Sequence, residues 1–317
     1  MRLEARSILT HIGRTPLVRL ARIARDLPVP VLVKCEHLNP GGSIKDRIAL
    51  AIVEDAEARG VLSPGMTLVE ATAGNTGIGL ALVAAARRYG LVCVMPDKMS
   101  FDKRVALSSL GARVIITPDA PPPSPDNFRN AAKRLAEENG WFLTDQFRNP
   151  ANIRVHEDTT GVEILEQTDG RVGAFVAGAG TGGTITGVGR RLKRALPRVR
   201  VVLADPVGSA LADWVETGTL GPDGDYAVEG IGASQAPENL HREVLDGVER
   251  VGDEESFAMV KRLVREEGLL VGGSAGTNVV AALRLAARGD LEGPVVTVLP
   301  DSWDRYRTKP WMQGWES

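Results

Sequence analysis

Lys45 is the residue of this sequence best placed for covalent chemistry. It follows two glycines in the segment of residues 39–47 and stands where a turn runs into a helix. Arg47 is two residues away, and a nearby cation or a helix start disfavours the ammonium form of a lysine. A neutral lysine amine is a nucleophile that forms Schiff bases with carbonyl compounds. Taken alone, however, the segment fits an ordinary surface helix capped by Ser43 better.

A second candidate is the small, polar loop of residues 72–77, with the sequence TAGNTG. It offers hydroxyl groups, the amide of Asn75 and unobstructed backbone N–H groups to an anion such as a carboxylate. The alternative is a tight turn from a strand into a helix capped by Thr76. The residues of this loop support both interpretations equally.

The third candidate is the glycine-rich loop of residues 178–184, GAGTGGT, which follows a predicted strand and opens a helix. Bare backbone amides at a helix N-terminus form a phosphate cradle. Close packing of helix on strand is the alternative, but so many glycines cost backbone entropy without adding packing. Gly178, Gly180 and Gly183 also fit the dinucleotide pattern, with Asp205 roughly 20 residues further on. An NAD enzyme is therefore a rival, although it gives Lys45 no role.

The fourth candidate is Ser274, in the segment of residues 272–277 that heads a predicted helix. A serine there ordinarily caps the helix, but its hydroxyl could also meet a ring nitrogen. Together the four loops offer an amine nucleophile, a phosphate cradle, a carboxylate-binding loop and a hydroxyl for a ring nitrogen. Pyridoxal phosphate is a cofactor that needs this whole set.

The predicted strands and helices alternate along the chain. Residues 17–20 form a short apolar segment after a turn at residues 13–16. Strands are predicted over residues 31–34, 67–70, 91–95, 113–117, 141–144, 172–177, 199–204, 269–271 and 295–299. Helices are predicted over residues 44–59, 78–89, 100–110, 128–138, 153–167, 184–195, 253–267 (capped by Asp253) and 275–287, and residues 206–235 are expected to be irregular. This alternation is typical of parallel sheets covered by helices on both faces. Ligands of such sheets collect at the C-terminal ends of strands, where these loops lie.

Composition limits the class of protein. The 317 residues are enough for one large domain or two ordinary ones. A formal net charge of −2 without a basic run argues against nucleic acid as a partner. Cys35 and Cys93 are far apart and form neither a metal-type pair nor a disulfide framework, which indicates a reducing compartment. With no signal peptide and no segment long enough to span a membrane, we expect a cytoplasmic protein.

The sequence resembles the β-family, or fold type II, of pyridoxal-phosphate enzymes, and within it the cystathionine β-synthase and cysteine synthase group. The shared motifs cover residues 12–17, 39–47, 72–77, 180–184, 228–232, 272–276 and 299–302, and the resemblance extends to about Lys309. It implies an α/β fold of two three-layer sub-domains with mostly parallel sheets, as in the tryptophan synthase β chain. The smaller, mobile sub-domain would comprise residues 41–145, and the larger one residues 1–40 and 146–317. A homodimer is also implied.

The resemblance assigns a role to each loop. Lys45 would form the Schiff base and move the Cα proton, Asn75 would contact the phenolic oxygen, and Ser274 would contact the pyridine nitrogen. The implied phosphate loop is Gly180, Thr181, Gly182, Gly183 and Thr184. The implied residues around the substrate carboxylate are Thr72, Gly74, Thr76 and Gln146, with Gly230 in a nearby active-site backbone segment.

The implied reaction is β-replacement on serine or O-acetylserine, in which an aminoacrylate intermediate takes up a thiol or sulfide. A hydroxyl such as that of Ser274 cannot keep a pyridine nitrogen protonated as an aspartate would, which suits β-elimination and disfavours transamination. Serine and threonine dehydratases usually carry histidine where Thr76 stands, so replacement is favoured over dehydration. A catalytically silent scaffold is a further alternative, which the intact set of loops argues against.

Two activities remain open within the group. Gly41-Gly42, residues 95–100 and residues 228–232 are similar to cystathionine β-synthases, which use serine and homocysteine. Ala233 and Ser234, however, stand where those enzymes commonly have a tyrosine. The sequence also has no counterpart of a haem-binding extension or a regulatory module, so we expect a compact, unregulated core. Such a core could equally be a cysteine synthase that uses O-acetylserine and sulfide.

Overall fold

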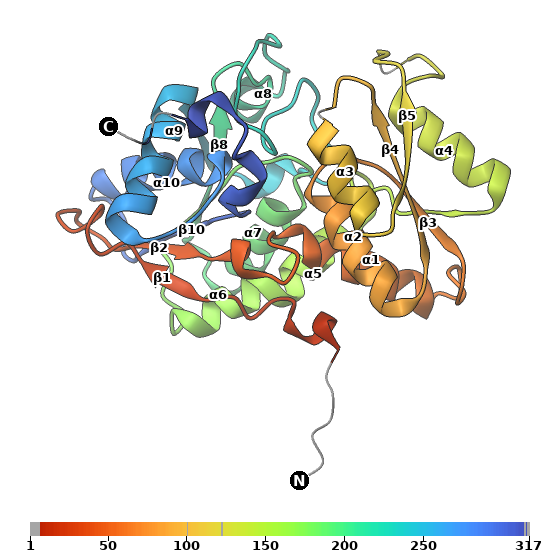
Figure 1. The fold of residues 1–317 in the computed structure, drawn as a ribbon. Helices are drawn as coiled ribbons and strands as arrows, with labels where there is room; N and C mark the ends of the chain where they lie inside the picture. The colour runs from red at the N-terminus through yellow and green to blue at the C-terminus, as the bar shows by residue number, and fades with distance from the viewer. Residues whose placement is uncertain (1–6, 100, 122, 314, 316–317) are drawn as a thin grey trace. The chain divides into compact units, whose positions relative to one another are not determined.

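The computed structural model describes residues 7–99, 101–121, 123–313 and 315 (Figure 1). Its backbone forms two compact units. The first holds the described residues up to Ile12 together with Asn39–Asn152, and the second holds Gly13–Leu38 and the described residues from Ile153 onward. The chain passes from the first unit to the second within α5 (Ala151–Val155). Each unit has its own sheet and its own apolar core.

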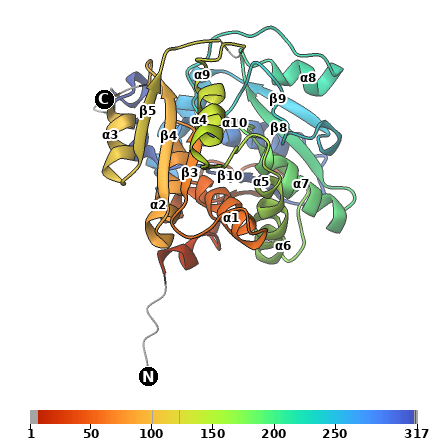
Figure 2. The same cartoon turned by 90° about the vertical axis from the view of Figure 1, so that its right-hand side faces the viewer.

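The first unit is built on a four-stranded parallel sheet with the strand order β5-β4-β3-β6. Its strands are β3 (Thr67–Ala71), β4 (Gly90–Pro96), β5 (Arg113–Thr117) and β6 (Phe142–Leu143). Its helices are η1 (Ile8–His11, 3₁₀), α1 (Lys45–Ala58), α2 (Asn75–Arg87), α3 (Phe101–Ser109) and α4 (Phe128–Asn139). Because successive strand residues point to opposite faces, Leu68 packs with α1, α2 and α3, whereas Val69 packs with α4. In Figure 2, α4 is turned toward the viewer.

The second unit is built on a six-stranded sheet with the order β1-β2-β10-β7-β8-β9, in which only the β1–β2 pair is antiparallel. Its strands are β1 (Leu17–Arg19), β2 (Val31–Lys34), β7 (Ala174–Ala177), β8 (Arg200–Pro206), β9 (Gly247–Val251) and β10 (Val295–Val298). Its α-helices are α6 (Gly161–Gln167), α7 (Gly183–Ala195), α8 (Leu211–Thr217), α9 (Asp253–Arg262) and α10 (Gly273–Ala287). Shorter turns are the π-helical η3 (His156–Thr160) and η5 (Leu263–Glu267) and the 3₁₀ turns η2 (Glu36–Leu38), η4 (Arg242–Val244), η6 (Trp303–Tyr306) and η7 (Pro310–Met312).

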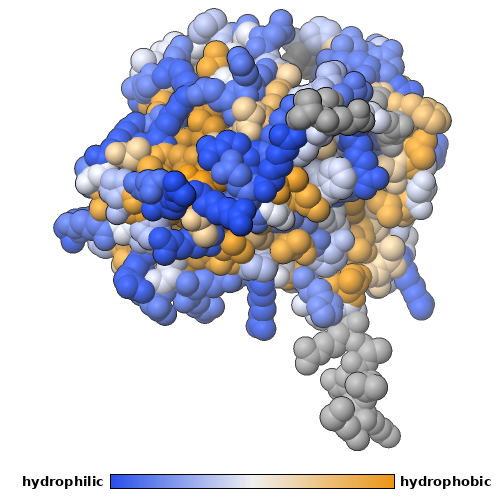
Figure 3. Space-filling model, turned by 60° about the vertical axis from the view of Figure 1, so that its left-hand side comes forward, coloured by the Kyte–Doolittle hydropathy of each residue, from blue (hydrophilic) through white to orange (hydrophobic). Residues whose placement is uncertain are grey.

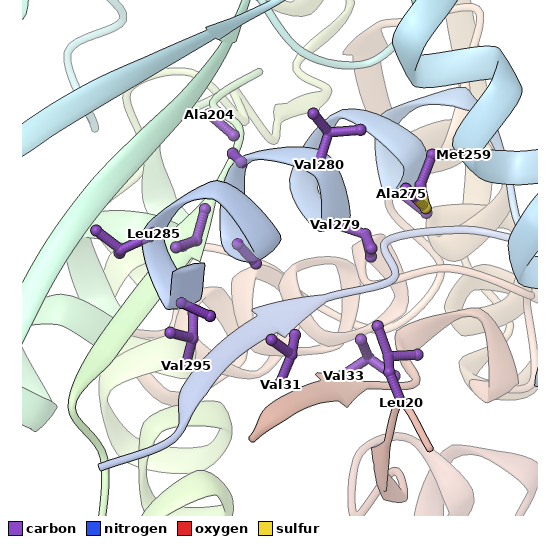
Figure 4. Packing of buried hydrophobic residues seen from close by; sticks show 14 of the residues in the cluster. Leu20, Val31, Val33, Ala204, Met259, Ala275, Val279, Val280, Leu285 and Val295 are labelled. Carbon is purple, nitrogen blue, oxygen red and sulfur yellow. The ribbon is translucent and has the colours of Figure 1, made fainter. Parts of the chain in front are cut away.

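Helices cover both faces of this second sheet. On one face α10 is buried along its length, and Val279 and Leu285 pack with Val31 and Val295 of the strands (Figure 4). On the other face α7 packs with Phe175 of β7. The predicted α/β fold with mostly parallel sheets and helices on both faces is therefore confirmed.

The surface face drawn in Figure 3 is mostly hydrophilic, with apolar residues scattered among the charged ones. Among the residues that the structure describes, no helix is both long enough and apolar enough to cross a membrane.

The local predictions failed in four places, each for a physical reason. Residues 269–271 form no strand and contribute only the single bridge of Val271 to Ser302. The edge strand β9 was not predicted, because its middle residues are charged. The helix α8 lies in the segment expected to be irregular. Asp253 does not cap α9, since its carboxylate accepts the N–H groups of Ala227 and Val228. The predicted start of α3, Ser100, lies outside the described residues.

Candidate active site

Lys45 is the first residue of α1 and is half-buried. The preceding turn is tight: Gly42 has φ +77° and donates its N–H to Asn39 O at 2.7 Å. A Cβ on Gly41 would overlap the Asp46 carboxylate, which accepts the Gly41 N–H at 2.5 Å. Both glycines are therefore required by the path that places Lys45 at the helix start.

Ser43 Oγ accepts the Lys45 N–H at 3.2 Å, but Ile44 rather than Ser43 is the N-cap of α1, so Ser43 is not the predicted cap. Arg47 is buried on the same helix, but side chains two residues apart on a helix do not face each other.

The helix that carries Lys45 lies beside the helix that carries Asn75. Asn75 is the first residue of α2, and Gly79 follows one turn later. A Cβ on Gly79 would lie only 3.0 Å from Lys45 O and 3.1 Å from Ala49 Cβ. The absence of a side chain at Gly79 thus lets the first turns of α1 and α2 come together, with Lys45 and Asn75 at the same end of this helix pair.

The four residues predicted to hold a substrate carboxylate are gathered in the first unit. Thr72 Oγ1 accepts the N–H of Gly74 at 3.2 Å. Thr76 donates its hydroxyl to Gln146 Oε1 at 2.5 Å across 70 positions of sequence. Thr72, Thr76 and Gln146 are all buried. Thr76 is not the cap of α2, since Gly74 occupies that position.

Glu70 is a neighbour of this group that sequence reasoning missed. It is 1% exposed, near the end of β3 and two residues before Thr72. Burial raises the pKa of its carboxyl to about 7, against the lowering effect of hydrogen bonds from Thr144 and Gln146. An acidic residue in the otherwise apolar strand TLVEA was the available signal.

The predicted phosphate loop lies in the second unit and packs against the segment that contains Gly230. A Cβ on Gly180 would overlap the carbonyl oxygen of Gly230, and Gly232 donates its N–H to Ala179 O at 2.9 Å. Gly182 has φ +84°, and a Cβ there would lie 2.5 Å from Leu240 Cβ. Only glycine allows the backbone this close approach.

The N–H groups of the first turn of α7, which begins at Gly183, have no acceptors within the helix. Such groups bind phosphate, helped by the helix dipole. Thr184 presents its hydroxyl in the same turn. Its Oγ1 lies 3.2 Å from Nε2 of His156, whose Nδ1 lies 3.0 Å from Thr160 Oγ1. His156 is buried in a π-helical turn and was also missed from the sequence.

Ser274 is the second residue of α10, and Gly272 rather than Ser274 is the cap. Its side chain is 2% exposed, and its hydroxyl has no hydrogen-bond partner among the residues that the structure describes. One turn later, Asn278 accepts the N–H of Gly178 at 2.7 Å and donates to Val298 O at 2.9 Å. Asn278 thereby ties α10 to the start of the glycine loop.

These observations fit pyridoxal phosphate. The second unit supplies a glycine cradle that a Cβ would fill and a buried serine hydroxyl without a partner in the described chain. The first unit supplies a lysine at a helix start and a buried hydroxyl–amide pair. Within each unit, these groups are held in place by the hydrogen bonds and close backbone contacts described above.

The rival dinucleotide site fits less well. Asp205, which would have to bind a ribose hydroxyl, is 0% exposed. Its carboxylate accepts the N–H of Ala212 at 2.8 Å and so starts α8. Gly178, the first glycine of the pattern, has its N–H bonded to Asn278. The geometry therefore does not favour an NAD enzyme.

Comparison with known proteins supports the cofactor. A family model described as "Pyridoxal-phosphate dependent enzyme" matches residues 8–301. The chain is 44% identical over 312 residues to a cystathionine beta-synthase of Apis mellifera, covering 97% of this chain but only 62% of that relative. It is 43% identical over 308 residues to a cysteine synthase of Staphylococcus aureus, covering 96% of each.

Two solved structures are also similar. A crystal structure of O-ureido-L-serine synthase matches with a TM-score of 0.90 and 41% identity, covering 99% of this chain and 97% of that one. A crystal structure of an O-acetylserine-dependent cystathionine beta-synthase from Helicobacter pylori matches with a TM-score of 0.87 and 36% identity, covering 98% of this chain and 99% of that one.

Proposed function

Because the chain belongs to the family of pyridoxal-phosphate-dependent enzymes, we propose that it catalyses β-replacement on a serine-type amino acid. Serine or O-acetylserine would supply the carbon skeleton, and a thiol or sulfide would replace its β substituent. The names of the relatives, cystathionine beta-synthase and cysteine synthase, support this reaction type. They give no support to dehydration or to hydride transfer.

When bound, the cofactor supplies an electron sink for the carbanion at Cα. We assign its covalent attachment to the amine of Lys45, which would also take the Cα proton and return it. Asn75 would bind the phenolic oxygen and Ser274 the ring nitrogen. The phosphate would be held by the backbone and hydroxyl groups of the loop residues Gly180, Thr181, Gly182, Gly183 and Thr184.

One observation carries most of this proposal: the buried pair of Thr76 and Gln146 lies in the same unit as Lys45. Thr76 follows directly on Asn75 at the start of α2, which packs against the first turn of α1. A substrate carboxylate held by Thr72, Gly74, Thr76 and Gln146 would be oriented by that unit alone. Orientation of this kind aims the Cα–H bond at the base that removes its proton. The family resemblance also assigns Gly230 to an active-site backbone segment.

The leaving group and the nucleophile are best settled by a matrix assay. Purified holoenzyme is given serine or O-acetylserine, each with sulfide or homocysteine, and the product is identified by mass spectrometry. We expect turnover with at least one pair and none from Lys45→Ala. If no β-substituted alanine is consumed with any nucleophile, β-replacement is the wrong assignment.

We also propose a cytoplasmic homodimer in which residues 41–145 move as a body when substrate binds. The two cysteines are free and buried, as expected in a reducing compartment. The separate apolar core around β3 and β4 is compatible with movement as one body. The dimer is supported by the family resemblance.

A further inference from the structure

Glu70 is a buried acid to which the proposed reaction gives no role. It occupies a strand whose other residues are apolar or small, and three donors surround it. The N–H of Ala71 donates to Oε1 at 3.0 Å, the hydroxyl of Thr144 donates to Oε2 at 2.5 Å, and the N–H of Gln146 donates to Oε2 at 3.1 Å. Burying a carboxyl group is unfavourable unless such bonds offset the loss of water.

The bonds from Thr144 and Gln146 join the two pieces of chain that make the carboxylate-binding group. Glu70 lies on β3, which leads directly into Thr72. Thr144 and Gln146 belong to the segment after β6, more than 70 residues later. With its backbone fixed by Glu70, Gln146 accepts the hydroxyl of Thr76.

The segment after β6 needs this support. Asp145, between the two residues that bond to Glu70, has φ +46°, a left-handed conformation that is unfavourable for a residue with a side chain. Asn152 adds one further bond by donating to Gln146 O at 2.8 Å.

We propose that Glu70 is a positioning residue for the substrate carboxylate, which it serves by holding Gln146 against Thr76. This inference rests on the proposed function. Glu70 itself touches no substrate. Its carboxylate provides acceptors to both backbone segments at once, which an amide of the same size cannot do.

A glutamine at this position would fail for a definite reason. Its amide group has one oxygen and one NH₂ group. In one orientation the NH₂ group meets the N–H of Ala71, and in the other it meets the N–H of Gln146. One backbone donor therefore loses its acceptor in either case, and a lost bond to a charged group costs more than a neutral one.

The charge of Glu70 adds a pH dependence. Its surroundings include Asp145 after β6, Cys93 on the paired strand β4 and Arg129 of α4. Burial is the largest cause that raises the pKa of Glu70, to about 7. Below that pH the carboxyl group is protonated, so one oxygen becomes a donor and a weaker acceptor for the N–H or O–H group that it faces. Carboxylate binding should therefore weaken as the pH falls through about 7.

The test uses holoenzyme and two ligands without a β leaving group, L-alanine and L-alaninamide. Binding is followed by the change in cofactor absorbance between pH 6 and 9. For Glu70→Gln we expect the affinity for L-alanine to fall by about ten- to a hundredfold, the loss of one charge-assisted bond. The affinity for L-alaninamide should change little, and the pH dependence near 7 should disappear for L-alanine.

Further variants keep the test independent of folding. Thr144→Val removes one donor and leaves both backbones and Glu70 in place, so it should show a smaller loss of the same selectivity, which Thr144→Ser should restore. Glu57→Gln is the matched control: Glu57 accepts the hydroxyl of Tyr89 at 2.7 Å, twelve residues along α1 from Lys45, or about 18 Å. It should bind both ligands as the wild type does.

The outcomes separate the two proposals. If the wild type binds L-alanine but Glu70→Gln binds it equally well, or loses both ligands to the same extent, the positioning role is wrong and the proposed function stands. If wild-type holoenzyme responds to no amino acid at all, the proposed function fails and this inference fails with it.

Discussion

A buried lysine is not by itself a catalytic lysine, as Lys34 demonstrates. Lys34 is 0% exposed, and its Nζ lies 2.6 Å from Glu163 Oε2 and also donates to Thr15 O and Gln167 Oε1. Such a set of partners holds a charged amine in place and leaves it unavailable as a nucleophile or base. Lys45 is assigned instead from its place at the start of α1, at the same end of the helix pair as Asn75.

Thr76 provides a prediction at the residue scale. Thr76→Val keeps the shape of the side chain but removes the hydroxyl that bonds to Gln146. We expect the KM for the amino acid substrate to rise about tenfold or more while kcat changes less, because a buried amide oxygen loses its donor. Steady-state kinetics measure both constants. Thr76→Ser should stay close to wild type, and an unchanged KM in the valine variant would remove Thr76 from the carboxylate site.

Sequence reasoning found the residues that stand in local motifs and missed those that act through distant contacts. Lys45, Asn75 and the glycine loop are recognisable within a few positions of sequence. Glu70 and His156 are not, because their partners lie 74 to 76 and 28 positions away. Only folding reveals such pairs.

At the scale of elements, the site depends on loops that must pass close to other backbone. The glycine loop packs against the segment of Gly230, and α2 packs on α1 through Gly79. The sequence contains these glycines but does not reveal which backbone atoms lie close to them. The elements that were predicted wrongly also depend on distant contacts. The start of α8 is fixed by Asp205, and the edge strand β9 is held to α8 by Arg250, whose guanidinium bonds to Asp213 and Glu216.

Gly182 provides the prediction at this scale. Gly182→Ala must place a Cβ against Leu240 and hold a left-handed φ, so we expect the loop to shift and the affinity for pyridoxal phosphate to fall by at least about tenfold. Equilibrium dialysis measures that affinity. Gly60→Ala is the matched control, because Gly60 has φ +69° but open space around its Cα. Gly60→Ala should be somewhat less stable but should bind pyridoxal phosphate with unchanged affinity. Equal cofactor affinity in the two variants would contradict the role given to the loop.

At the scale of the whole molecule, the alternation of strands and helices was sufficient to predict an α/β fold with parallel sheets. The strand order was not predictable. In the second unit β10, the last strand of the chain, lies between β2 and β7. This order follows from pairings between residues more than a hundred positions apart, for which a single sequence gives no signal.

The cysteines provide a prediction for the folded chain as a whole. Cys35 and Cys93 are each at most 1% exposed, and burial raises the pKa of each thiol to about 12. Thiolates are the reactive form, so we expect almost no reaction of the native protein with Ellman's reagent and two thiols per chain after unfolding in guanidinium chloride. Rapid reaction of a native thiol would show that one of the two cores opens readily.

Borohydride reduction tests directly whether Lys45 carries the cofactor. Reduction converts a lysine Schiff base into a stable secondary amine, which peptide mass spectrometry then locates. We expect the phosphopyridoxyl group on Lys45, and none on the Lys45→Ala variant. A phosphopyridoxyl group on a different lysine, or full labelling of Lys45→Ala, would contradict it.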